Sequence, residues 1–458
     1  MNSSLFSEFS PTDKEAWTQQ ALKDLKGKDF EKTLLWNTPE GFVVEPYYTG
    51  DDIEEEKTVP VQAAQQKKLG WLTQPVVVYE NERVTNAAIM ALLQKGVDAV
   101  TLDIKSIPIE KIELTKLLNG IRLSDTPIFF KTNGQNAALL SSLQTFIAYQ
   151  MKGGLVEDGL AEWMTKGELA ENYFEELAAT VALTKSSPHF KAICVSSHVF
   201  HNAGANAAQE LAFTLASAVT YVDKLTDAGI SAEEAFSKFY FSISVGTNYF
   251  MEIAKVRSLR YLWQKMQGAW GLELTSAYIH AQTSTYYDAA ITANTNLLRA
   301  TTEAMSAVIG GCDALTVHAY DAAFRLPDEF SERIARNISI LLKEESYLDK
   351  TLDPAAGSYF LENLTQQLVD TAWRLFLEVE EKGGLMAAFE QNYIQDQIEQ
   401  NAHSALESLQ QGSNIMVGVN KFRFDEEPVK DAVNVESVKD SVPYRLLQNQ
   451  RIAQSFEQ

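Results

Sequence analysis

The sequence predicts an α/β fold, a parallel (β/α)₈ barrel of the TIM type with an N-terminal arm and a C-terminal helical extension. Short apolar runs alternate with stretches of helical periodicity, which is the pattern of a parallel barrel, and a doubly wound open sheet is the alternative. A barrel takes roughly 250 residues, so the 458 residues of this chain leave segments at both ends. The eight apolar runs begin at Val76, Ala99, Ile128, Leu155, Ala192, Phe239, Glu273 and Ala314.

The last two runs show the repeating unit most clearly. Residues 273–280 alternate apolar and polar side chains, as a strand does, and residues 296–309 carry apolar side chains at helical spacing. Gly310-Gly311 ends that helix, and residues 313–320 form the next strand. Between the earlier runs we expect helices at 86–95, 109–119, 136–149, 169–184, 205–228 and 249–265.

Residues 1–70 form the predicted arm. A cap residue, a proline and an acid in Ser10-Pro-Thr-Asp13 predict a helix that runs to about Lys26. Residues 41–48 are typical of a short strand, and the acidic residues 51–56 of a solvated turn or helix start. Because this segment carries little apolar surface of its own, we expect it to lie on another surface, such as a partner chain.

The barrel is expected to span residues 71–350. Helical patterns at 332–345, 361–382 and 385–411 exceed the one helix that closes a barrel, so residues 351–423 are interpreted as a helical extension. Residues 424–458 are polar and are interpreted as a linker or tail, with Asp425-Glu-Glu-Pro428 as the linker signal. Lys152-Gly-Gly154 and Lys382-Gly-Gly384 are interpreted as turns that end helices.

Composition narrows the class of protein. The net charge of −22 disfavours nucleic acid and anionic membranes as partners. The two cysteines, Cys194 and Cys312, lie in apolar runs and are expected to be buried free thiols. The N-terminus has neither a basic nor an apolar signal region, and no apolar stretch reaches about 18 residues, so a cytoplasmic location is expected.

A parallel barrel carries its chemistry at the carboxyl ends of its strands. His198 and His201 stand three residues apart after the fifth run, but side chains three apart on a strand point to opposite faces and no metal-ligand spacing accompanies them, so no metal site is expected. Nucleophile-elbow and phosphate-loop motifs do not occur in the sequence. The other strand-end polar residues are Glu80, Asp103, Lys131, Glu157, Asp158, Ser244, His280, Gln282 and His318.

Several motifs occur between the sixth strand and the end of the helical extension. They are Asn248-Tyr-Phe-Met-Glu-Ile-Ala-Lys255, Gln282-Thr-Ser284, Arg299-Ala-Thr-Thr-Glu-Ala-Met305, Asp321-Ala-Ala-Phe-Arg-Leu-Pro327, Glu332-Arg-Ile-Ala-Arg-Asn337, Asp353-Pro-Ala-Ala-Gly-Ser-Tyr359 and Val417-Gly-Val-Asn-Lys421. These motifs resemble the methylmalonyl-CoA mutase family of adenosylcobalamin-dependent isomerases. The resemblance is strong over residues 195–422, and upstream the chain resembles the family's small, non-catalytic subunit.

The resemblance implies that the catalytic residues are not intact. Val199 stands where the catalytic subunit has an active-site histidine, and His198 and His201 stand where it has tyrosine and glutamine. Lys238 and Tyr240 replace an arginine and a serine that contact CoA there. His280 and Gln282 match the family, whereas His318 replaces an asparagine. These polar residues are therefore candidates for a vestigial substrate cleft.

The family's cobalt-binding motif, Asp-x-His-x-x-Gly, does not occur in the 458 residues. The resemblance thus implies a small subunit that binds no cofactor itself and forms a heterodimer with a large catalytic subunit, which holds adenosylcobalamin; the complex would interconvert methylmalonyl-CoA and succinyl-CoA. The alternatives are an active acyl-CoA mutase barrel that uses cobalamin from a separate subunit, and a barrel that only binds a CoA ester.

Loss of a ligand would let side chains grow into the barrel interior, since barrel interiors pack densely. Phe239 and Phe241 share one face of their strand and Tyr240 takes the other. We expect a closed or much narrowed axial cavity, with inward-pointing side chains drawn from Phe129, Phe130, Phe239, Tyr240, Phe241, Tyr286 and Tyr287.

Overall fold

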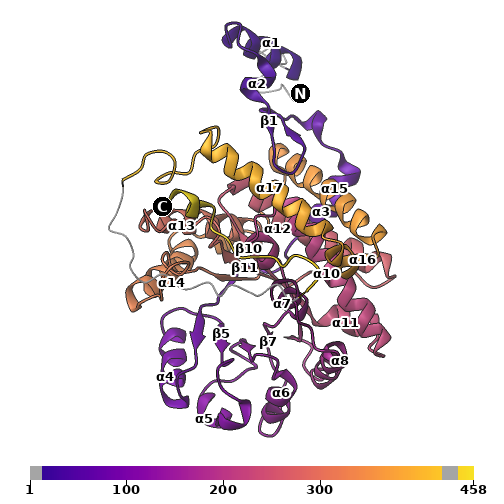
Figure 1. The fold of residues 1–458 in the computed structure, drawn as a ribbon, viewed down its shortest axis with the longest axis vertical. Helices are drawn as coiled ribbons and strands as arrows, with labels where there is room; N and C mark the ends of the chain where they lie inside the picture. The colour runs from indigo at the N-terminus through magenta and orange to yellow at the C-terminus, as the bar shows by residue number, and fades with distance from the viewer. Residues whose placement is uncertain (1–12, 425–441, 458) are drawn as a thin grey trace, which may run out of the picture.

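The computed structural model describes residues 13–424 and 442–457, and its core is a ring of parallel strands (Figure 1). The strands form two five-stranded sheets, ordered β3-β12-β11-β10-β9 and β4-β5-β6-β7-β8. Their bounds are β3 Leu72–Thr73, β4 Val76–Val78, β5 Val100–Asp103, β6 Ile128–Lys131, β7 Gly153–Leu155, β8 Phe190–Lys191, β9 Ile193–Ser196, β10 Phe239–Val245, β11 Ile279–Thr283 and β12 Ala314–Thr316.

At each edge, one strand continues from the first sheet into the second: β3 continues as β4, and β8 continues as β9. The two sheets therefore close into one barrel. Only Gln74-Pro75 separates β3, which pairs with β12, from β4, which pairs with β5. Only Ala192 separates β8, which pairs with β7, from β9, which pairs with β10. The ring therefore contains eight parallel strands, which confirms the predicted (β/α)₈ barrel, whereas a doubly wound open sheet would end in two edge strands.

Each half of the ring has its own apolar layer beneath its helices. In one layer, Val77, Leu102, Ile128 and Phe130 pack under the helices that follow β4 to β7. In the other, much larger layer, residues of β9 to β12 pack under α10, α12, α13 and the post-barrel helices. Figure 1 shows the two halves as separate lobes, with α4, α5 and α6 below β10 and β11.

Every predicted barrel helix has a counterpart. The predicted helix at 109–119 is divided into a 3₁₀ turn, Ile109–Lys111, and α5, because Ile112 is extended. The predicted helix at 169–184 begins later, at Tyr173. The helices are α4 Glu82–Leu93, α5 Leu114–Leu117, α6 Asn136–Gln144, α7 Gly159–Lys166, α8 Tyr173–Leu183, α9 His198–His201, α10 Ala207–Asp227, α11 Ala232–Lys238, α12 Tyr249–Ala269, α13 Thr295–Ile309 and α14 Glu329–Glu344.

Two sequence interpretations inside the barrel are wrong. Gly153-Gly154 is not a turn but the start of the fourth strand, β7, where a Cβ on Gly153 would lie 2.0 Å from the Ile128 carbonyl oxygen. The seventh strand begins at Ile279 rather than Glu273. Residue Thr275 donates its backbone N–H to the Gln267 side chain, which occupies the donor that a neighbouring strand would need.

The N-terminal arm consists of α1 Lys14–Asp24, α2 Phe30–Leu34, a two-stranded antiparallel hairpin of β1 Trp36–Asn37 and β2 Val43–Val44, and α3 Glu55–Ala64. Asp13, which the sequence placed in the first turn, is instead the N-cap of α1, while Ser10 and Pro11 lie outside the described residues. Helices α1 and α2 bury no residue and project from the barrel (Figure 1). Helix α3 packs against α12 and α15.

The three helices after the barrel, α15 Tyr359–Glu381, α16 Gly384–Glu390 and α17 Tyr393–Gln410, cover the larger apolar layer. The turn at Lys382-Gly-Gly384 ends α15 as predicted. Residues 425–428, the expected linker, lie outside the described residues. Residues 442–457 lie against the protein rather than extending from it, with Leu447, Ile452 and Ala453 buried. None of the helices within 13–424 and 442–457 is both long and apolar enough to cross a membrane.

Candidate functional site

An aromatic cluster occupies the barrel interior near the amino ends of the strands. Phe129 and Tyr240 point inward and meet with ring centroids 5.3 Å apart, and Cys194 and Tyr278 pack beside them. Phe130, Phe239 and Phe241 point outward into the helix layers instead. We call Phe129, Cys194, Tyr240 and Tyr278 the lumen cluster. It fills the lumen at this level with bulky side chains, and of the predicted strand aromatics it contains Phe129 and Tyr240.

A belt of hydrogen-bonded side chains runs along one wall of the lumen, nearer the carboxyl ends of the strands than the lumen cluster. His198 Nε2 lies 2.9 Å from Ser242 Oγ, and its Nδ1 lies 2.6 Å from Ser244 Oγ. Ser242 Oγ also contacts His280 Nδ1 at 3.2 Å, and His280 Nε2 lies 2.8 Å from Thr316 Oγ1. The belt thus joins α9, β10, β11 and β12 through neutral hydrogen-bonding groups.

Burial keeps these imidazoles uncharged. It lowers the pKa of His280 to about 3 and that of His318 to about 4, and it lowers the pKa of His198 well below its usual value, with the neighbouring histidines adding to the effect. A general base or acid works best when its pKa lies near the working pH. At neutral pH the belt can therefore orient polar groups by hydrogen bonds, and it is poorly matched to proton transfer.

The mouth of the barrel holds two further predicted residues. Gln282 donates to Ser242 Oγ at 3.0 Å, and its Oε1 lies 3.1 Å from His318 Nε2. On the neighbouring wall of the lumen, on the strand that continues β3 next to β12, Val76 and Val78 face inward, because Val77 between them packs outward into the helix layer. Their side chains remain 45% and 63% exposed. The lumen is therefore solvated beside β4, although it is filled beside β6 and β10.

Two predicted site residues lie away from this mouth. Val199 is on α9, is buried, and belongs to the large apolar layer, so its side chain offers no hydrogen bond. Lys238 ends α11 immediately before β10, at the amino end of the strand. Its Nζ donates to the carbonyls of Thr184 and Ser187 at 2.7 and 2.9 Å, and burial lowers its pKa to about 8. The structure thus separates Lys238 from Gln282 and His318 along the barrel axis.

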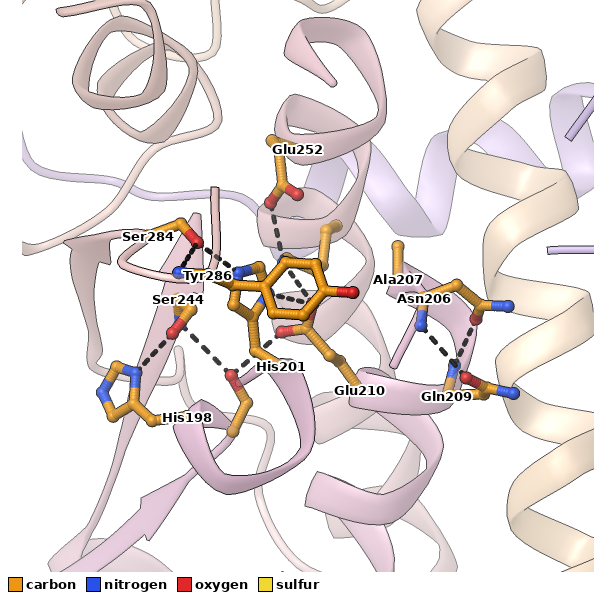
Figure 2. A network of polar contacts seen from close by, with 12 residues as sticks. His198, His201, Asn206, Ala207, Gln209, Glu210, Ser244, Glu252, Ser284 and Tyr286 are labelled. Carbon is orange, nitrogen blue, oxygen red and sulfur yellow. Dashed lines mark hydrogen bonds and ion pairs between the residues drawn. The ribbon is translucent and has the colours of Figure 1, made fainter. Parts of the chain in front are cut away.

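His201 belongs to a second, fully buried network. Figure 2 shows its ring between Ser284 and Glu210, with Tyr286 beside it. His201 Nε2 lies 2.6 Å from Ser284 Oγ, and Nδ1 lies 2.8 Å from Glu210 Oε1. Residues 198–201 form helix α9 rather than a strand, contrary to the sequence interpretation. Even so, the two histidines serve separate networks and do not converge on one point.

Lys255 joins two carboxylates in this network. Its Nζ lies 3.0 Å from Glu210 Oε1 and 2.7 Å from Glu252 Oε2, and the three side chains are at most 7% exposed. Burial alone would raise the pKa of Glu210, but Lys255 and His201 outweigh it and lower that pKa. For Glu252 burial prevails over Lys255 and raises the pKa. We call His201, Glu210, Glu252, Lys255 and Ser284 the buried charge network.

The sequence interpretation missed this network except for His201. Glu210 lies in a helix with Phe213, Thr214 and Ser217, which share its buried face at helical spacing. Lys255 sits among apolar residues of α12 in the same way. A charged residue within the apolar face of a helix could have indicated this network, because buried charges are rare unless they are paired.

Four of the remaining strand-end residues have partners that account for them, and Glu80 is exposed. Asp103 Oδ2 lies 3.8 Å from Lys131 Nζ. Glu157 accepts hydrogen bonds from the backbone N–H groups of Thr132 and Asn133, and burial raises its pKa. Asp158 caps α7 and accepts a 2.6 Å hydrogen bond from Tyr221. These groups are structural by their contacts, and they do not extend the polar belt.

The described residues hold no group of three or more His, Cys, Asp or Glu side chains arranged to bind a metal ion. The hydrogen-bonding groups of the belt contact one another: both ring nitrogens of His198 and both ring nitrogens of His280 contact hydroxyl groups. The imidazoles of His198 and His280 therefore have no free nitrogen with which to bind a metal ion. What they offer is a neutral polar surface at the mouth above a filled lumen.

Comparison with known proteins identifies the family. The sequence pattern of the family described as Methylmalonyl-CoA mutase matches residues 96–455. The methylmalonyl-CoA mutase small subunit of Porphyromonas gingivalis is 37% identical over 94% of this chain and 73% of its own length. The small subunit of Streptomyces virginiae is 29% identical over 93% of this chain and 73% of its length. The large subunit of Streptomyces virginiae is 30% identical over 92% of this chain and 64% of its length. The barrel, the motifs and these matches agree that the chain belongs to the methylmalonyl-CoA mutase family.

Proposed function

We propose that this chain is the small subunit of a heterodimeric methylmalonyl-CoA mutase and that its barrel is a non-catalytic scaffold. The lumen cluster carries the proposal: Tyr240 is fully buried against Phe129 at the level where a substrate chain would have to pass. Val199 adds support, since a buried valine cannot donate a hydrogen bond to a thioester carbonyl. Adenosylcobalamin would then belong to the large subunit, whose barrel would carry the rearrangement.

The arm is the proposed contact with the large subunit. Its helices α1 and α2 bury nothing, and Leu22, Trp36, Val43 and Tyr47 are exposed apolar side chains on this projecting segment. Apolar side chains gathered on one projecting element mark interaction surfaces more than scattered ones do. The post-barrel helices α15 and α17 lie at the base of the arm and would extend the contact.

Activity and assembly test the proposal together. The purified chain with adenosylcobalamin and methylmalonyl-CoA should form no succinyl-CoA, whereas the chain with its large subunit should elute as a heterodimer and be active. Val43→Asp in the arm should weaken the heterodimer, and Val84→Asp on α4 should not, although both valines are 44% exposed. Turnover by the chain alone at the rate of the complex, or a homodimer that ignores the large subunit, would refute it.

A second candidate is a barrel that still binds a CoA ester at its mouth. The observation in its favour is the solvated wall at Val76 and Val78, which lies on the strand next to β12, on the same side of the mouth as the polar side chains of Gln282 and His318. Calorimetric titration with CoA and methylmalonyl-CoA separates the two functions. A scaffold should give no saturable heat at millimolar ligand, whereas a dissociation constant near about 1 μM, or about −8 kcal/mol, would establish a binding barrel.

A further inference from the structure

The C-terminal residues 442–457, here called the strap, cross the barrel from α7 to the segment that follows β11 (Figure 1, yellow). Only a short 3₁₀ turn, Ile452–Phe456, is regular within them. Residues 445–450 form neither helix nor strand. The conformation of the strap is therefore set by its contacts with the surface beneath it.

Three backbone N–H groups of the strap donate to carbonyls of three different elements. Leu447 donates to Met164 on α7 at 2.9 Å, and Gln450 donates to Asn202 after α9 at 2.8 Å. Ile452 donates to Tyr286, after β11, at 3.0 Å. Main-chain hydrogen bonds of this kind with alternate side chains buried are how grooves hold extended peptides.

Two groups of apolar side chains anchor the strap. Tyr444 accepts a 2.8 Å hydrogen bond from Trp163 Nε1 and packs against the Trp163 and Phe389 rings. Leu447 is buried in the larger apolar layer. At the other end Ile452 and Ala453 pack with Tyr286, Leu409, Met416 and Val419. These anchors bury apolar surface at both ends of the strap.

A polar clamp on α17 holds the strap between its anchors. The Arg445 guanidinium pairs with Asp396 and, at 2.5 Å, with Glu399. The Arg445 backbone N–H donates to Asn392 Oδ1 at 2.8 Å, and its carbonyl accepts from Gln395 Nε2 at 2.7 Å. Because α17 supplies two carboxylates here, the groove is selective for a basic side chain at this position.

The strap also touches the wall of the buried charge network. Ile452 and Arg451 bind the backbone of Tyr286 and Asp288. Tyr286 in turn donates its N–H to Ser284 Oγ at 3.1 Å, and the rings of Tyr286 and Tyr287 each lie 6.0 Å from the His201 ring. The strap thus fixes the segment that closes the network from solvent.

We propose that the groove formed by α7, α9, α17 and residues 286–290 is a docking site for an extended peptide of the pattern Tyr-Arg-x-Leu. The strap, through Tyr444, Arg445 and Leu447, is its exchangeable occupant in cis. When the strap leaves, the groove is free for a peptide of the same chemistry, and the wall of the buried charge network loses its restraint. This inference does not depend on the proposed subunit role.

The test uses the full chain with a specific protease site placed between Phe424 and Val442. After cleavage, a fluorescent peptide with the sequence of residues 442–458 should displace the severed strap and bind saturably. A peptide with Arg445→Gln should bind about fivefold more weakly, since exposed ion pairs contribute up to about a kcal/mol. A scrambled peptide should not bind. Equal binding of the scrambled peptide, or a severed strap that never exchanges while the protein stays folded, would overturn the proposal.

Hydrogen exchange supplies the second readout. Once the strap has been removed by dilution, the amides of residues 284–291 should exchange at least tenfold faster, and excess peptide should restore their protection. The amides of β10 serve as the internal control and should not change. Unaltered exchange at 284–291, or loss of protection throughout β10, would show that the strap is an inseparable part of the fold.

Discussion

Replacing Lys255 with methionine should destabilise the protein by about 3–5 kcal/mol at pH 7.5. The side chain is 2% exposed, and it is the ammonium that pairs with both Glu210 and Glu252. Methionine fills a similar volume, so the loss comes from leaving two carboxylates buried without a cation rather than from a cavity. Removing one partner of a buried ion pair typically costs about this amount.

The pH dependence of that loss identifies its cause. Without Lys255, the pKa values of Glu210 and Glu252 in the folded state rise above those of the unfolded chain, so both carboxyls destabilise the fold when they are charged. Their protonation on acidification relieves this cost. The difference in unfolding free energy between Lys255→Met and the wild type should therefore shrink from pH 7.5 to pH 5.5. Adding Glu252→Gln should restore part of the stability at pH 7.5.

Urea unfolding followed by tryptophan fluorescence measures these differences, and Lys224→Met, an exposed lysine at the end of α10, is the matched control with an expected change within about 0.5 kcal/mol. A loss below about 1 kcal/mol for Lys255→Met, or a loss that does not vary between pH 7.5 and pH 5.5, would refute the view that Lys255 neutralises the network.

Three further outcomes follow from the barrel interior. Gly153→Ala should cost about 3 kcal/mol or more in urea unfolding, because φ is +111° and the new Cβ meets a carbonyl, whereas Gly134→Ala, with positive φ but open space, should cost about 1 kcal/mol. Tyr240→Phe should change stability by less than about 1 kcal/mol, since the neighbour of its hydroxyl is the weakly hydrogen-bonding Cys194 thiol, but Tyr240→Ala should cost about 3–5 kcal/mol through the cavity it leaves. The pKa of His280, about 3, lies below that of an unfolded histidine, so its contribution to stability is fully present above about pH 6.5 and is lost progressively as pH falls. His280→Asn should therefore make the unfolding free energy less dependent on pH between pH 6 and pH 4, by up to about 1.4 kcal/mol per pH unit.

Local pattern was enough to predict the barrel and most of its helices. Asn136 and Tyr249 are the first residues of α6 and α12, as predicted, because apolar spacing and cap residues are properties of neighbouring residues. The glycine pair at 153–154 was misread, since glycine commonly ends helices. Its actual role is set by the β6 backbone, which leaves no room for a Cβ, and no local signal reports such an approach.

The sequence predicted which residues belong to the candidate site, but it did not predict how they contact one another. His198, His280, Gln282 and His318 were recognised as strand-end polar residues, and the structure brings them together in one belt and its mouth. Lys238 was grouped with them, but it lies at the opposite end of its strand. The predicted start of this strand at Phe239 already placed Lys238 at its amino end, and Lys238 was grouped with the site only because it stands where the family has an arginine that contacts CoA.

The sequence by itself determined the alternation of eight strands and their helices, the placement of Phe239 and Tyr240 on opposite faces of one strand, and the likeness to the family; which of the two faces the lumen was decided by the tertiary structure. Tertiary structure alone decided where the strand ring is interrupted, which side chains meet in the lumen, and where the strap lies. Pro75 has no N–H to donate to a continuous hydrogen-bond ladder, but the strands that pair on either side of it, β12 with β3 and β5 with β4, are distant from it in sequence. The pairing of Lys255 with Glu210 likewise joins two helices, so only packing of the whole chain could bring these charges into contact.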